Sequence, residues 1–169
     1  MLSGMDLVAW DNRITAFYRD SFDESDPQRS IAALHELLDT IDADDAGALA
    51  AFELAGVHDS LGDEEEAVPL YREALAAGLD AEHQARARIQ LASTLRNLGR
   101  LDEALELLAV PAEGVVEPAR KAFFALALHS AGRHDEALRE AIEGIVPGLP
   151  RYQRSLTGYA AALTDHATE

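Results

Sequence analysis

The fold is decided by one motif that occurs three times, as Leu61-Gly-Asp-Glu-Glu-Glu-Ala-Val68, Leu98-Gly-Arg-Leu-Asp-Glu-Ala-Leu105 and Ala131-Gly-Arg-His-Asp-Glu-Ala-Leu138. The glycines of the three copies, Gly62, Gly99 and Gly132, follow one another at nearly equal intervals. A glycine followed by acidic residues is typical of a turn between two helices, because glycine adopts the left-handed backbone that ends one helix and carboxylates favour the N-terminus of the next. This recurrence predicts stacked helical hairpins, none of which can bury its apolar face alone.

The composition also favours an all-α fold. Alanine and leucine far outnumber the β-branched valine and isoleucine along the chain. Apolar residues recur at helical spacing, which predicts a first helix over Asp6–Asp20 and a second one that begins at Pro27 and carries Ile31, Leu34, Leu38 and Ile41. Cysteine is absent, which excludes disulfides, thiol nucleophiles and cysteine-ligated metals.

The negative charge is unevenly distributed along the 169 residues. The net charge is −17, but residues 1–80 hold 19 acids and 4 bases, whereas residues 81–169 hold 12 acids and 10 bases. Nucleic acid and anionic membranes are therefore not expected as partners. No apolar run is long enough to span a membrane and the first residues lack an export signal, so we expect a cytoplasmic protein.

The spacing between large and small residues carries a family resemblance. The large residue of each first helix precedes the alanine of the second by the same interval in every repeat, from Leu54 to Ala67, from Leu91 to Ala104 and from Phe124 to Ala137. This pattern resembles the tetratricopeptide repeat (TPR) family, and the stretch 86–100 is similar to a bacterial branch of small stand-alone proteins in which homodimers are suspected.

The resemblance implies the architecture of the whole chain. We expect one domain over residues 1–169, built as a right-handed solenoid of antiparallel helical hairpins. Its parts would be a degenerate hairpin over residues 1–45, three repeats over 46–146 and a capping helix over 150–166.

The resemblance further implies a concave groove lined by the first helix of each repeat, which would hold a peptide or a protein segment. Polar residues at steps of four, three and four share one face of the middle first helix, and an arginine lies beside them. The candidate residues there are Arg86, Gln90, Ser93, Asn97 and Arg96, continued on one side by Leu49 and Phe52 and on the other by Leu126 and His129.

The function expected from these features is a non-enzymatic protein-binding module without a cofactor. Its partner would carry an acidic segment or a free C-terminus. Two alternatives stay open: a self-assembling homodimer, suggested by the two unlike charge halves, and a regulatory domain that acts beside a separate catalytic protein. No histidine pair has metalloprotease spacing, and no glycine-rich phosphate loop is present.

One stretch, residues 42–53, partly matches a calcium-binding loop. The repeat register instead predicts that residues 48–60 form a helix, which would place Glu53 in mid-helix, out of reach of a bound ion. We therefore expect no metal site.

Overall fold

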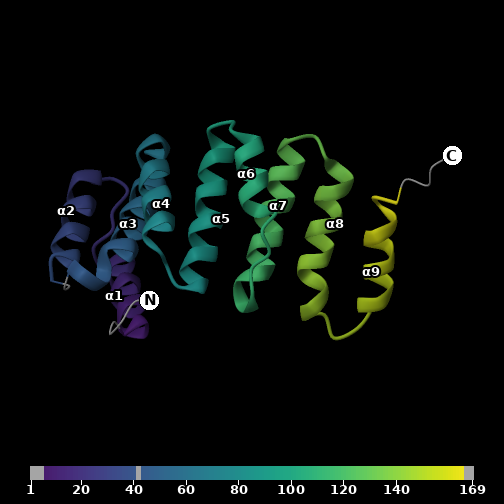
Figure 1. The fold of residues 1–169 in the computed structure, drawn as a ribbon, viewed down its shortest axis with the longest axis horizontal. Coiled ribbons are helices and arrows are strands. Elements are labelled where there is room, and N and C mark those ends of the chain that lie inside the picture. The colour runs from purple at the N-terminus through teal and green to yellow at the C-terminus, as the bar shows by residue number, and fades with distance from the viewer. Residues whose placement is uncertain (1–5, 41–42, 166–169) are drawn as a thin grey trace. The chain divides into compact units, whose positions relative to one another are not determined.

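The computed structural model describes residues 6–40 and 43–165. These residues form α-helices and two short 3-10 helices, and no strand occurs among them, so the predicted all-α fold is confirmed (Figure 1). The contacts within the chain define two compact units, the first ending at Ala87 and the second starting at Arg88. The boundary falls inside one helix, α5 (Ala81–Asn97).

The first unit contains α1 (Leu7–Asp20), α2 (Pro27–Leu38), α3 (Ala43–Ser60), α4 (Glu64–Ala77) and the beginning of α5. The carboxylate of Asp6 caps α1 by accepting the backbone N–H groups of Val8 and Ala9 at 3.1 and 3.2 Å. Helix α2 begins at Pro27 as predicted, because proline fits the first turn, where no helical hydrogen bond is lost.

The core of the first unit joins the α1–α2 hairpin to α3. Its buried members are Trp10, Ile14, Phe17, Leu34, Leu49 and Val57. The first two helices therefore depend on α3 for the burial of their apolar faces, as expected of a degenerate hairpin at the end of a repeat array. Ile41, which the periodicity assigned to the second helix, lies outside the described residues.

The second unit contains the remainder of α5, then α6 (Leu101–Leu108), the 3-10 helix η1 (Gly114–Val116), α7 (Glu117–Ser130), α8 (His134–Ile145), the 3-10 helix η2 (Val146–Gly148) and α9 (Gln153–Ala162). Gly132 turns the chain between α7 and α8 with a φ of 77°, the left-handed conformation that its place in the motif predicted. The N–H of Arg133 donates to the carbonyl of Leu128 at 2.9 Å and closes this turn.

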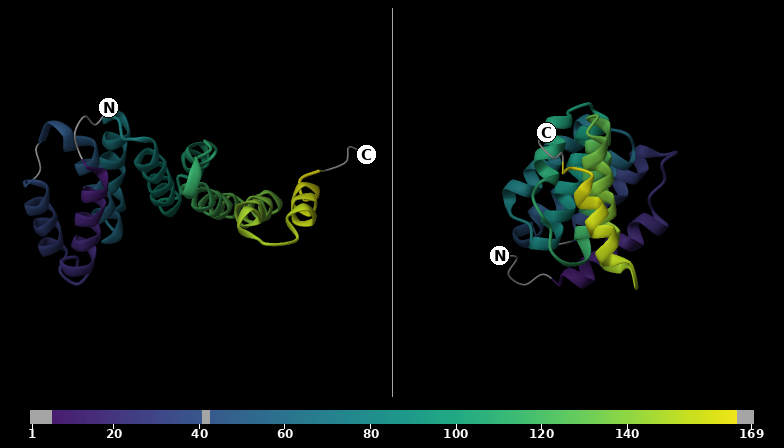
Figure 2. Two further views of the ribbon diagram at one scale, coloured as in Figure 1. Left: turned by 90° about the horizontal axis from the view of Figure 1, so that it is seen from below. Right: turned by 90° about the vertical axis from the view of Figure 1, so that its right-hand side faces the viewer.

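Helix α8 lies between α7 and α9 (Figures 1 and 2) and contacts both of them. Helix α9 falls within the predicted capping helix over 150–166, of which residue 166 lies outside the described residues. The right-handed winding of the hairpins and the single domain over residues 1–169 remain predictions.

Candidate functional site

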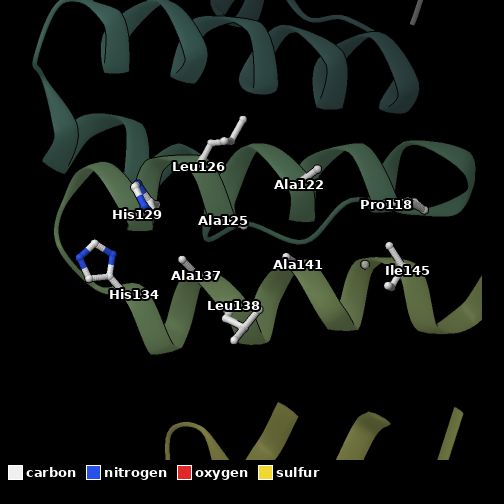
Figure 3. A pocket seen from close by; sticks show the side chains of 11 residues that line it. Pro118, Ala122, Ala125, Leu126, His129, His134, Ala137, Leu138, Ala141 and Ile145 are labelled. Carbon is white, nitrogen blue, oxygen red and sulfur yellow. The ribbon is translucent and has the colours of Figure 1, made fainter. Parts of the chain in front are cut away.

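The second unit has an apolar groove of about 580 Å³ between α7 and α8 (Figure 3). Small residues from both helices form its floor: Ala122, Ala125, Ala137, Ala141 and Gly144. Larger side chains stand around it, and three of them are unusually exposed for their size: Leu126 at 48%, Leu138 at 51% and Ile145 at 59%. Pro118, His129 and His134 complete the lining, and we call this surface the α7/α8 groove.

Three small residues of the floor, Ala125, Ala137 and Gly144, lie where the two helices approach each other closely. Ala125 and Ala137 are buried. A Cβ built onto Gly144 would lie 3.1 Å from the Cβ of Lys121, which is tighter than ordinary contact. Ala125, Ala137 and Gly144 thus fix the spacing of the hairpin, while the exposed leucines and the isoleucine are not needed for that spacing.

Charged side chains of this hairpin pair with one another outside the groove. The Nζ of Lys121 lies 3.1 Å from Glu140 and 2.8 Å from Glu143, and Arg139 donates to Glu143 at 2.8 Å. The hydrogen bond from Lys121 lowers the pKa of the Glu143 carboxyl. Among the described residues, no carboxylate, ammonium or guanidinium group lines the groove, so a ligand with a charged contact face would lose hydration there without finding a partner.

One end of the groove carries two imidazoles. The rings of His129 and His134 have centroids 4.8 Å apart and are exposed where α7 turns into α8 (Figure 3). In the part of the chain that the structure describes, no three potential metal-ligating side chains come together. This pair therefore places polar ring nitrogens at one end of an otherwise apolar surface.

Of the predicted site residues, Leu126 and His129 line the α7/α8 groove. Arg96, also in the second unit, donates through Nε to the Oγ of Ser130 at 2.8 Å. Gln90 and Ser93 are half-buried and Asn97 is exposed. The predicted polar face takes residues from both units, and a continuous groove along it remains a prediction.

Leu49 and Phe52 offer no surface to a ligand, because they are only 0% and 2% exposed. Leu49 belongs to the core of the first unit. The ring of Phe52 packs edge-on against the ring of His83, 6.0 Å away, and the guanidinium of Arg86 lies 5.8 Å from its centroid. Arg86 also approaches Asp11 at 3.7 Å, so this predicted binding residue holds α5 to α1 and α3.

Glu53 is a buried acid in the first unit to which the sequence pattern assigned no role. It lies in the middle of α3 and is 5% exposed, and the indole Nε1 of Trp10 donates to its Oε1 at 3.4 Å. Burial raises the pKa of Glu53 from 4.5 to about 7, although the hydrogen bond from Trp10 and the nearby Arg86 oppose this rise. The sequence signal that could have predicted this burial is that the acidic Glu53 directly follows Phe52, beside other buried positions of α3.

A family model described as tetratrico peptide repeat matches residues 48–163, which is more than half of the chain. The chain belongs to the tetratricopeptide repeat family, as its repeat register predicted. Members of this family act as protein–protein interaction modules and are typically non-catalytic. A search among curated proteins found no match to the sequence. Within the described residues, no helix has both the length and the hydrophobicity of a membrane span.

Proposed function

We propose that this protein is a binding module that holds an apolar protein segment in the α7/α8 groove. The observation that carries the proposal is the exposure of Leu126, Leu138 and Ile145 around a floor of small residues. Concave apolar surfaces of this kind occur where proteins bind ligands or partners. The proposal keeps Leu126 and His129 from the predicted site and leaves out the buried Leu49 and Phe52.

The groove favours an apolar segment over the acidic one that the sequence suggested. Two arginines of the α7–α8 hairpin that could attract a carboxylate are already paired with acids of the same hairpin: Arg120 with Glu117 at 2.7 Å, and Arg133 with Glu136 at 2.6 Å. A partner held there gains from apolar burial, at about 25 cal/mol per Å² removed from water. Its contact face should therefore have apolar residues three or four positions apart, as on an amphipathic helix.

Photo-crosslinking in cells tests this proposal. A photoreactive phenylalanine replaces Leu138 on the groove in one variant, and in the control it replaces Val115, an exposed apolar residue of η1 in the same unit. We expect a discrete protein adduct at position 138 that is absent at position 115. Sequencing should place the crosslink in a segment with apolar residues at helical spacing. Equal labelling at both positions, or no adduct at position 138, would contradict the proposal.

A further inference from the structure

The α7/α8 groove is open because two large side chains of the first repeat have small counterparts in the third. In the register that pairs Leu54 with Phe124, Phe52 and Tyr71 of the first repeat correspond to Ala122 and Ala141. Phe52 and Tyr71 are buried with ring centroids 6.2 Å apart. Ala122 and Ala141 line the groove from its two sides (Figure 3) and leave unfilled the space that such rings would occupy.

In the earlier repeats the next helix covers this face. In the first unit, His83 and Arg86 at the start of α5 lie on the ring of Phe52. In the second unit, the counterparts of the two aromatic residues are Ile89 and Leu108, both buried. Helix α7 contacts α6, and the guanidinium of Arg120 donates to the carbonyl of Leu108. A helix is therefore the natural occupant of this face, and the one that follows α8 is α9.

Helix α9 contacts α8, but none of its residues lines the groove. Its inner side carries Ala160, which is fully buried, whereas Tyr152 and Tyr159 are 74% and 70% exposed. Tyr159 lies inside α9, whereas Tyr152 precedes the first turn of this helix and has a left-handed backbone with a φ of 70°. The outward side of α9 thus presents the ring of Tyr159, which no residue of the described part of this copy covers.

The length of α9 also matches that of the groove, and the net charge of this part of the chain does not oppose a contact between two copies. The ten residues of α9 span about 15 Å, and the 11 steps from Pro118 to His129 on the groove span about 16 Å. Arg154 is the one charged residue of α9. Residues 81–169 hold nearly equal numbers of acids and bases, 12 and 10, so two copies of this part would not repel each other as two copies of the acidic first half would.

We propose that the α7/α8 groove binds α9 of a second copy of this chain, with Tyr159 inserted between Ala122 and Ala141. This inference rests on the proposed function, for which it names the partner. The contact is reciprocal, since each copy has both a groove and an α9, so a two-fold dimer makes it twice. A tyrosine from the partner then occupies the space that Phe52 and Tyr71 fill in the first repeat.

The test uses two full-length variants and one control, with the molar mass measured by light scattering after size exclusion over a range of concentrations. Tyr159→Ala removes the inserted ring. Ala122→Phe fills the groove with the residue that the first repeat has at this position. Val115→Ala is the control, because it shortens an exposed apolar side chain outside the groove. Thermal melting monitors the folding of each variant.

We expect a dimer, at twice 18.2 kDa, for the wild type and the control. Each of the two variants should raise the dimer dissociation constant about a hundredfold, because each loses both copies of the contact. A mixture of Tyr159→Ala and Ala122→Phe should regain part of the association, since the first variant offers an intact groove and the second an intact α9.

A monomeric wild type, or a dimer that both variants leave intact, would overturn this inference. A different result would contradict the proposed function, namely that the crosslinker at position 138 captures no protein. If it captures a different protein while the wild type is monomeric, the groove is a binding site and a second copy is not its occupant. If Ala122→Phe does not fold, Tyr159→Ala still decides the outcome, since it changes an exposed side chain.

Discussion

Replacing the buried acid of the first unit by glutamine should make the protein more stable at alkaline pH. Glu53 is 5% exposed, and its polar partner in the core is the indole of Trp10. Burial raises the pKa of Glu53 from 4.5 to about 7. Glutamine has the shape of the protonated acid and keeps an oxygen that can accept the indole N–H. The variant Glu53→Gln therefore removes the charge without removing the hydrogen bond.

The sign and size of this stability difference follow from the pKa of Glu53 in the unfolded protein, 4.5, and in the folded protein, about 7. Because the folded state holds this proton more tightly than the unfolded state, stability falls as the pH rises through the interval from 4.5 to about 7. The loss is absent below that interval and complete above it. A rise in the pKa of Glu53 from 4.5 to about 7 corresponds to a loss of about 3 kcal/mol in the free energy of unfolding at pH 8. This value is an upper bound for the gain in Glu53→Gln, since the added amide N–H groups also need partners.

Urea denaturation followed by tryptophan fluorescence measures this effect directly. Trp10 is the single tryptophan of the chain and donates its hydrogen bond to Glu53, so its emission reports on the unit that contains the acid. Glu53→Gln should exceed the wild type in stability at pH 8, and the difference should fall to less than about 1 kcal/mol at pH 5, near the lower end of the interval. Glu36→Gln, which changes an exposed glutamate on α2, serves as the matched control.

Equal slopes of stability against pH for the wild type and Glu53→Gln between pH 5 and pH 8 would contradict this prediction. A variant that is less stable than the wild type at pH 8 would also refute it. In either case the charged carboxylate would be stabilised in the core by groups that outweigh its burial. The Glu36→Gln control must keep the wild-type slope for the comparison to be valid.

Two further predictions concern the second unit, both measured by urea denaturation followed by circular dichroism. Gly132→Ala should lower the free energy of unfolding by about 1 kcal/mol, because φ is 77° there, whereas Gly158→Ala inside α9 should raise it by a similar amount. An added Cβ meets nothing within 4 Å at either position, so the two variants differ in backbone conformation and not in packing. Changes of the same sign in both variants would contradict this prediction. Arg120→Leu should lower the free energy of unfolding by about 3 kcal/mol, because the buried guanidinium of Arg120 pairs with the Glu117 carboxylate. Arg133→Leu, which breaks an exposed ion pair, should lower it by less than about 1 kcal/mol. Similar losses in the two variants would show that the burial of Arg120 adds no stability.

The repeat register predicted the hairpins because it depends on local backbone chemistry. Gly62, Gly99 and Gly132 all have positive φ values, as their place in the motif requires. The helices on either side follow from alanine and leucine at helical spacing. Pro27 likewise marked the start of α2. These features are decided within about one helical turn of each residue, so one sequence is enough to predict them.

The burial of Leu49 and Phe52, the predicted binding residues of the first unit, was harder to predict, since burial depends on which other helix covers a position. The periodicity places Phe52 on a definite face of α3, but it does not show that α5 covers that face with His83 and Arg86. It also does not show that Trp10 of α1 meets Glu53. Both contacts join residues that are far apart in the sequence, and no local pattern specifies them.

The α7/α8 groove could be predicted from the sequence only in part. Its small residues were readable, because Ala137 and Ala141 stand in the register of Ala67 and Tyr71. Whether the space above Ala141 is filled depends on where the next helix packs, and α9 contacts α8 without lining the groove. In a repeat array, each hairpin buries its face against the helix that follows, and the α7/α8 groove is a face that α9 leaves uncovered. Exposing this apolar surface to water costs free energy, and a binding partner that covered it would recover that cost. The α7/α8 groove, rather than the buried face of α3, is therefore the place to look for a partner.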